Sequence, residues 1–99
     1  MTVIDNHLDS IESICAKHYV DKLYLFGSAL SSRFNNQSDL DFLVKFQPVE
    51  LSEYFNNYLD LKNELSSLFG RDIDLLEEQA LKNPILIESI NNSKELVYG

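Results

Sequence analysis

The stretch from Gly27 to Phe46, GSALSSRFNNQSDLDFLVKF, decides the fold. It opens with a Gly-Ser pair that ends an apolar run, and it closes with an alternating segment that predicts a β-strand over residues 39–46. Successive side chains of a strand point to opposite faces, so one face carries Leu40, Phe42, Val44 and Phe46, and the other carries Asp39, Asp41, Leu43 and Lys45. Two like charges at the start of an otherwise apolar strand are costly, which points to a functional role for the pair.

On the N-terminal side of this stretch, the sequence predicts a helix followed by a strand. Apolar residues recur at helical spacing from Asp5 to His18. The short apolar run over residues 22–27 then predicts a central strand that ends at glycine. Residues 28–34 are expected to form a short helix, and residues 35–38 have the composition of a turn.

On the C-terminal side, helices and strands continue to alternate. Apolar spacing predicts a long helix over residues 51–69, with Gly70 as the residue that ends it. The segment DIDLL, residues 72–76, predicts a third strand. Asn83 followed by Pro84 predicts the start of a helix that runs to about Asn91, and residues 95–99 are expected to form an edge strand or a packed tail.

This order of elements predicts an α+β (α/β) fold, a small mixed sheet with helices packed mainly on one face. A chain of 99 residues with 44% hydrophobic residues is sufficient for one core, so we expect a single domain over residues 1–99. The formal net charge of −8 disfavours direct binding of DNA or RNA, whose phosphates would be repelled. The same charge favours a basic protein partner, or a small anionic ligand that arrives with metal ions.

Cysteine usage and hydropathy indicate the cellular environment. Cys15 is the single cysteine, so no internal disulfide can form, which is typical of a reducing compartment. The N-terminal sequence is acidic and periodic and does not resemble a signal peptide, and no apolar run approaches the roughly 20 residues of a membrane span. We therefore expect a cytoplasmic protein without a membrane segment.

The acidic residues predict a metal site. Asp39 and Asp41 lie on one face of a strand with Cα atoms roughly 6.5–7 Å apart, so their carboxylates can converge. Hard cations such as Mg²⁺ prefer carboxylate oxygens and complete their shell with water and substrate phosphates. Two such ions can assist a phosphoryl displacement, and a third carboxylate is then expected. Asp74 is the favoured third ligand because it lies deeper in its apolar run than Asp72.

The Gly-Ser pair predicts a phosphate site. Gly27 and Ser28 lie between a strand and a helix, where free backbone N–H groups and the helix dipole favour an anion. Glycine lets a phosphate approach the main chain, and the serine hydroxyl adds a donor. Arg33, later on the short helix, is expected either to contact the phosphates or to fix an acidic side chain.

Together these residues resemble a known family. Gly27-Ser28, ten further residues and then Asp39-Leu40-Asp41 are similar to the signature of the DNA polymerase β-type nucleotidyltransferase superfamily. The small size of the chain resembles the minimal nucleotidyltransferase (MNT) branch of that superfamily. The resemblance implies the nucleotidyltransferase fold and the transfer of a nucleoside monophosphate from an NTP, with ATP expected, to a hydroxyl acceptor.

The resemblance also implies roles for individual residues. Gly27 and Ser28 would bind the triphosphate, and Asp39 and Asp41 would ligate two Mg²⁺ ions. Asp74 would ligate the metal nearer the acceptor and help to deprotonate its hydroxyl. Minimal members act as antitoxins of HEPN-domain proteins, so a HEPN-domain partner is expected. Many members have an arginine-glycine pair where this chain has Ser31 and Ser32, which leaves the role of Arg33 open.

Structural explanations compete with these roles. Asp74 could be an exposed strand residue, and Arg33 could form only a surface ion pair. The chain could be a catalytically silent antitoxin that acts by binding, or it could transfer to a small-molecule hydroxyl, with a homo-oligomer supplying the acceptor pocket. His7 and His18 have no metal-ligand partner at useful spacing, so structural or surface roles are expected, and Cys15 is expected in the core.

Aromatic residues of the long helix have helical spacing, so core packing is expected for most of them: Tyr54, Phe55, Tyr58 and Phe69. Aromatic side chains exposed beyond the needs of the core would instead indicate a protein interface.

Overall fold

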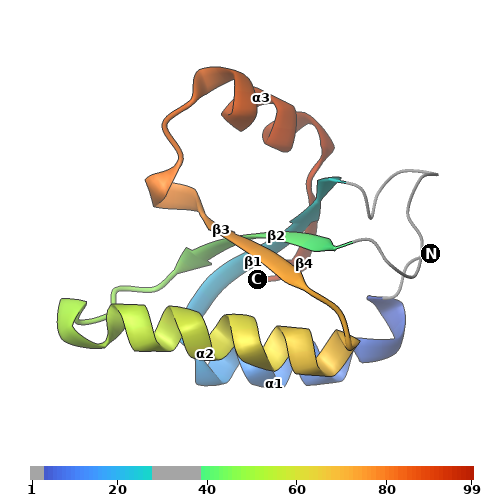
Figure 1. Ribbon diagram of the computed structural model, residues 1–99, viewed down its shortest axis with the longest axis vertical. Coiled ribbons are helices and arrows are strands. Elements are labelled where there is room, and N and C mark those ends of the chain that lie inside the picture. The colour runs from blue at the N-terminus through green and yellow to red at the C-terminus, as the bar shows by residue number, and fades with distance from the viewer. Residues whose placement is uncertain (1–3, 28–38) are drawn as a thin grey trace.

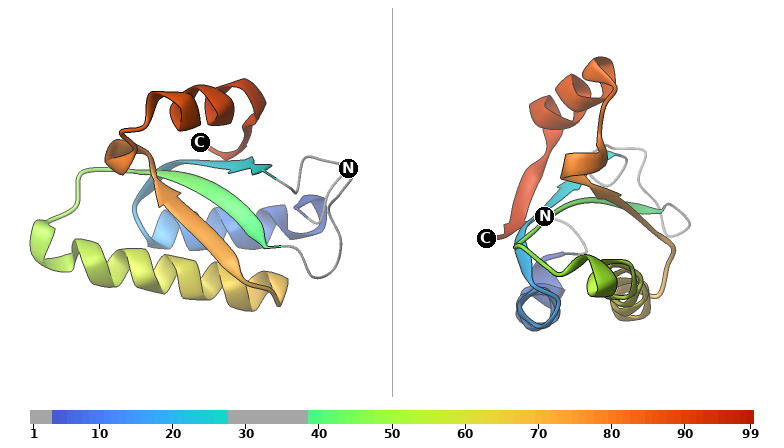
Figure 2. Two further views of the ribbon diagram at one scale, coloured as in Figure 1. Left: turned by 45° about the horizontal axis from the view of Figure 1, so that its top comes forward. Right: turned by 90° about the vertical axis from the view of Figure 1, so that its left-hand side faces the viewer.

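The computed structural model describes residues 4–27 and 39–99, which form a four-stranded sheet with helices on both faces (Figures 1 and 2). The strands are β1 (Val20–Phe26), β2 (Leu40–Phe46), β3 (Ile73–Glu77) and β4 (Glu95–Tyr98). Their order across the sheet is β3-β2-β1-β4. β1 is antiparallel to both of its neighbours, and β2 and β3 are parallel. The predicted mixed sheet is confirmed, with β1 central and β4 at an edge.

Two long helices cover one face of this sheet, and a shorter helix lies on the other (Figure 2). The helical elements of the described chain are the 3₁₀ turn η1 (Asp5–His7), α1 (Leu8–Lys17), α2 (Leu51–Phe69), the 3₁₀ turn η3 (Glu78–Ala80) and α3 (Pro84–Ser93). α1 and α2 lie side by side below the sheet in Figure 1, and α3 lies above it. The prediction that helices pack mainly on one face is confirmed.

β2 is buried on both faces because the core is built around it. Phe42 is fully buried toward the two long helices and stacks on Phe69 of α2, with ring centroids 6.0 Å apart. On the opposite face, Leu43 packs with Phe26 of β1 and with Ile90, the buried residue of α3. The strand is therefore fixed in the middle of the molecule, and its N-terminal end has a defined position relative to β1 and β3.

α2 is the crossover that places β3 beside β2. Parallel strands cannot be joined by a tight hairpin, and α2 supplies the longer connection. Leu61 and Leu65 anchor the helix by complete burial. Gly70 ends it in the left-handed conformation (φ 65°), and its N–H donates to the carbonyl of Ser66 at 2.8 Å. Gly70 thus has the predicted role.

Two predicted boundaries in the N-terminal half differ from the structure. β1 begins at Val20, earlier than the residue 22 start that we predicted, because a register shift between Val20 and Lys22 interrupts the alternation. The expected helix over Asp5–His18 begins as the 3₁₀ turn η1 and becomes α-helical at Leu8.

The C-terminal helix begins as its sequence predicts. Asn83 caps α3 because its Oδ1 accepts from the backbone N–H groups of Ile85 and Leu86 at 2.9 and 3.3 Å. Pro84 occupies the first turn, where its missing N–H is tolerated. The helix continues to Ser93, beyond the expected end near Asn91.

His18 and Cys15 are structural, as expected. His18 is buried, and its imidazole is hydrogen-bonded to Asn57 and Glu64 of α2, which fastens the end of α1 to that helix. The hydrogen bond with His18 is the main reason that the pKa of Glu64 lies below its usual value. Cys15 is completely buried, and that burial raises the pKa of its thiol to about 12, so the thiol stays protonated.

The prediction for the aromatic residues of α2 is wrong in one case. Phe55 is 65% exposed, while Tyr54 and Tyr58 are half-buried and Phe69 packs against the core. Leu51, also part of the apolar spacing, is 90% exposed. Among the described helices, none is both long enough and apolar enough to cross a bilayer.

Candidate active site

Asp41 lies at the centre of the predicted site because two strands place residues opposite it. In the antiparallel pair, Asp41 is opposite Phe26, the last residue of β1. In the parallel pair, Asp41 is directly opposite Asp74 of β3. Neighbouring strands lie about 4.8 Å apart, and opposite residues share a face. The register therefore brings the carboxylates of two predicted ligands together on the face that carries α3.

The Asp41–Asp74 pair is electrostatically unfavourable by itself. Like charges directly opposite each other on neighbouring strands destabilise a sheet. Asp41 is partly buried and Asp74 is exposed. Oxygen ligands of this kind match what Mg²⁺ requires, and that ion commonly takes one or two protein carboxylates and completes its shell with water and phosphate. The residues present thus fit a magnesium–nucleotide complex.

Gly27 lies against the side chain of Asp41. It follows β1 directly and adopts a positive φ of 76°, which glycine tolerates and other residues rarely adopt. A Cβ added here would collide with Oδ2 of Asp41 and would lie 3.0 Å from its Cγ. Glycine is therefore required both by the backbone conformation and by the approach of the Asp41 side chain.

The remaining predicted residues are less completely placed. Asp39 is exposed and lies just before β2. The N–H of Leu40, the first residue of β2, donates to the carbonyl of Asp72 at 3.1 Å. Within residues 4–27 and 39–99, no three His, Cys, Asp or Glu side chains are grouped closely enough to hold a metal ion together. Ser28 and Arg33 lie outside the described residues, as do Ser31, Ser32 and the expected helix and turn over residues 28–38.

The strand register, and not burial, is the reason to choose Asp74 over Asp72 as the third ligand. The sequence favours Asp74 because it lies deeper in the apolar run, but both residues are exposed. Asp74 is opposite Asp41, whereas Asp72 precedes the strand and is outside the paired register. The structure thus gives a different reason for the same choice.

Sequence reasoning missed two tyrosines beside β3. The hydroxyl of Tyr58 donates to the carbonyl of Leu75, and burial, followed by the charge of Asp74, raises the pKa of Tyr58. Burial and the neighbouring Glu77 raise the pKa of Tyr54 to about 12. Both rings therefore stay neutral near pH 7 and border the strand that carries Asp74. Helical spacing alone suggested that both tyrosines pack in the core. Their hydroxyl groups are the one sequence feature that distinguishes them from ordinary core residues.

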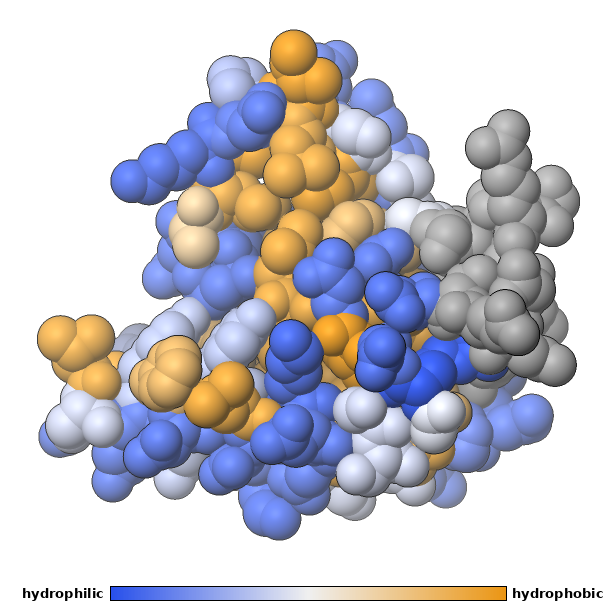
Figure 3. All heavy atoms as spheres, viewed as in Figure 1, coloured by the Kyte–Doolittle hydropathy of each residue, from blue (hydrophilic) through white to orange (hydrophobic). Residues whose placement is uncertain are grey.

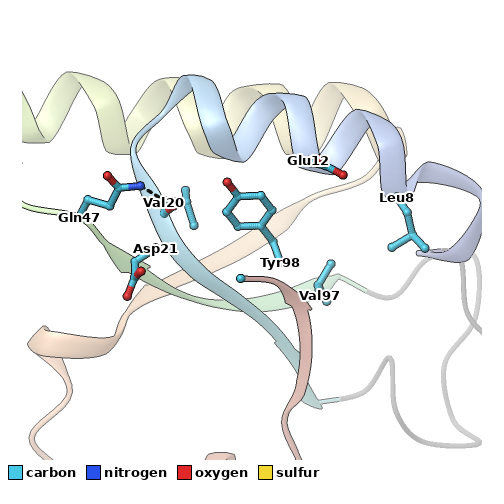
Figure 4. A pocket seen from close by; sticks show the side chains of 8 residues that line it. Leu8, Glu12, Val20, Asp21, Gln47, Val97 and Tyr98 are labelled. Atoms are coloured by element: carbon cyan, nitrogen blue, oxygen red, sulfur yellow. Dashed lines mark hydrogen bonds between the residues drawn. The ribbon is translucent and has the colours of Figure 1, made fainter.

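A separate hollow of about 530 Å³ lies on the far side of the sheet from this site (Figure 4). It lies between α1 and the β1–β4 edge, where Tyr98 points toward α1 and Gln47 donates to the carbonyl of Val20 at 3.3 Å. Of the predicted ligands that the structure describes, none lines it. The hollow is therefore separate from the paired carboxylates of Asp41 and Asp74.

Comparison with known proteins agrees with the observed fold. Residues 9–99 match the family described as "Polymerase beta, Nucleotidyltransferase". A relative from Methanocaldococcus jannaschii, named "Putative protein adenylyltransferase MJ0128", is 34% identical over 82 residues, which cover 83% of this chain and 79% of the relative. The match includes nearly the whole predicted domain.

Two solved structures share the fold. A structure described as a "putative minimal nucleotidyltransferase" superposes with a TM-score of 0.76 and 27% identity, covering 93% of this chain and 90% of that one. A chain of the complex described as "tri-AMPylated Shewanella oneidensis HEPN toxin in complex with MNT antitoxin" superposes with a TM-score of 0.67 and 17% identity, covering 98% of this chain and 73% of that one. This chain therefore belongs to the polymerase beta nucleotidyltransferase family, and its fold is that of the minimal nucleotidyltransferases.

Proposed function

We propose that this chain transfers AMP from ATP to a hydroxyl group of a HEPN-domain protein partner. The observation that carries the proposal is the register of β2 against β3, which places Asp41 opposite Asp74 beside Gly27. The adenylyltransferase name of the relative and the AMPylated HEPN toxin of the solved complex support AMP as the transferred group.

In this proposal the three acids hold the metal and the Gly-Ser corner holds the nucleotide. Asp39, Asp41 and Asp74 would ligate Mg²⁺, which, when bound, neutralises phosphate charge that the acidic site would otherwise repel. Gly27 and Ser28 would receive the triphosphate, since the absence of a side chain at Gly27 admits close approach to the main chain. Arg33 would contact a phosphate.

The transfer itself is an in-line displacement. The acceptor hydroxyl oxygen attacks the α-phosphorus, the bond between that phosphorus and the bridging oxygen breaks, and pyrophosphate leaves. Asp74 accepts the hydroxyl proton. The protein contributes position and charge, as phosphoryl transfer generally requires.

Asp74 and Asp72 offer a matched test within one short segment. We expect Asp74→Asn to lower AMP transfer at least about tenfold, because the amide cannot accept the proton and binds a cation weakly. Asp72→Asn removes an equal charge from an exposed residue outside the register and should change the rate less than about twofold. The measurement is the transfer of α-labelled phosphate from ATP to the product of the neighbouring reading frame, with Mg²⁺ present.

The same experiment separates this proposal from a silent antitoxin. If the neighbouring protein forms a stable complex with this chain but carries no label, the chain acts by binding alone and not by catalysis. If the two substitutions lowered the transfer rate equally, Asp74 would have no special role in the site.

A further inference from the structure

An apolar groove runs beside the strand that carries Asp74. It lies between α2 and the β3–η3 segment, has a volume of about 430 Å³, and is lined chiefly by Tyr54, Phe55, Tyr58, Leu75, Leu76 and Leu81. Phe55, Leu76 and Leu81 retain exposed surface. A groove of this size is in the range of ligand and peptide sites.

The groove belongs to a wider apolar surface. Leu51 and Leu59 of α2 are 90% and 37% exposed, and Ile85 and Leu86 of α3 are 79% and 40% exposed. Figure 3 shows apolar side chains over α3 and down across the end of the sheet, with more at the N-terminal end of α2. Exposed apolar surface of this extent on a small domain marks an interaction site.

The charges around the groove are predominantly acidic. The β3–η3 segment carries three acids and no cation over residues 73–80: Asp74, Glu77 and Glu78. Glu77 lines the groove itself. α2 contributes one cation on this side, Lys62, one turn after Tyr58. The three acids of α2 lie on the side of the helix that faces α1 and Tyr19. An occupant with basic residues beside its apolar ones is therefore complementary to the rim.

The same charges argue against a second copy of this chain as the occupant. Each copy has a formal net charge of −8, and packing two such grooves together would place acidic rims against each other. Like charges brought together at an interface disfavour that pairing.

An extended strand is also a poor occupant. β3 is an edge strand, so its outer carbonyls are available for pairing with an added strand. The hydroxyl of Tyr58 already donates to the carbonyl of Leu75. An added strand would have to share this carbonyl with Tyr58, whereas a helix that inserts apolar side chains between α2 and η3 would leave the bond unchanged.

We propose that this groove docks a basic amphipathic helix of the protein that accepts AMP. The groove begins at Leu75, next to Asp74, so a docked helix would hold its protein beside the proposed reacting centre. The identity of the occupant as acceptor rests on the proposed function; the preference of the groove for a basic amphipathic helix does not.

The test is an equilibrium titration without nucleotide. The probes are fluorescein-labelled helical peptides of about 16 residues with leucine or phenylalanine along one face and lysine on the other, together with twins in which glutamate replaces lysine. Binding is followed by anisotropy with the full chain and repeated with Asp41→Ala. We expect the lysine peptides to bind, and to bind more weakly at high salt because the rim charges are screened.

Two surface variants locate the binding. Phe55→Ser removes the most exposed aromatic residue of the groove and should weaken binding at least about tenfold. Leu96→Ser alters a 53% exposed residue of β4, at the other edge of the sheet, and should leave binding within about twofold.

Several outcomes would overturn the proposal. These are no binding by any lysine peptide, equal binding by the glutamate twins, an equal effect of Leu96→Ser, or self-association of the chain that Phe55→Ser abolishes. If the peptides bind with the expected pattern but the labelling assay shows no AMP transfer, the docking site is supported and catalysis is refuted. AMP transfer at an unchanged KM for the acceptor in Phe55→Ser would retain catalysis and refute the docking site.

Discussion

Replacing Asp41 by alanine is expected to lower the rate of AMP transfer about a thousandfold. Asp41 is the residue that both neighbouring strands place at the centre of the site, opposite Phe26 on one side and Asp74 on the other. Its loss removes a proposed magnesium ligand and the negative charge that the metal would neutralise. The measurement is the initial rate of label transfer from ATP at saturating Mg²⁺.

Lys45→Ala is the matched control for this substitution. Lys45 lies on the same strand and the same face, further from the site, and its 3.9 Å ion pair with Asp21 is exposed. Such a pair contributes little to stability, roughly 0–1 kcal/mol. Transfer by Lys45→Ala should therefore stay near that of the unaltered chain. Activity within about threefold of the unaltered chain in Asp41→Ala would remove Asp41 from the mechanism.

Gly27→Ala is expected to lower transfer about a hundredfold, because a small displacement of a positioned catalytic group has effects of that size. The added Cβ would collide with Oδ2 of Asp41, so the carboxylate must move away from its position opposite Asp74. The left-handed backbone adds a cost of about 1 kcal/mol to folding. Transfer rate and thermal unfolding are measured on the same preparation.

Gly70→Ala separates these two effects. Gly70 has a similar positive φ of 65°, but a Cβ there would meet nothing within 4 Å. We expect both variants to lose similar stability and only Gly27→Ala to lose activity. If Gly70→Ala lost as much activity as Gly27→Ala, backbone strain alone would explain both results, and contact with Asp41 would have no special importance.

The elements that the sequence predicted best are those with strong local signals. Asn83 with Pro84 predicts the start of α3, and Gly70 predicts the end of α2, because capping chemistry acts over a few residues. The alternation through β2 predicted both of its faces.

Other features depend on contacts between distant segments. The pairing of Asp41 with Asp74 is set by the register of two strands that α2 separates. The alternation of each strand fixes which face a side chain takes, but not which residue of the distant strand lies opposite it. The register shift between Val20 and Lys22 depends on the pairing with β2, and it interrupts the alternation from which the start of β1 was predicted. His18 is buried because Asn57 and Glu64 of α2 satisfy its ring, which the spacing of apolar residues does not indicate.

The exposed apolar residues of α2 show a limit of periodicity. Phe55 and Leu51 follow the same helical spacing as buried Leu65, so the sequence assigns them to one stripe. The sheet is too narrow to cover the whole stripe, since β3 is its edge strand. Phe55, in the uncovered part, lines the groove, and exposure of this kind is typical of a protein interface.

Calorimetric titration of ATP into the chain, with and without Mg²⁺, tests the central claim most directly. We expect ATP to bind only with Mg²⁺, because the acidic site repels the free triphosphate, and we expect Asp41→Ala to abolish this binding while the protein stays folded. Equal binding of ATP without Mg²⁺, or unchanged binding by Asp41→Ala, would contradict a metal–nucleotide site at the paired carboxylates of β2 and β3.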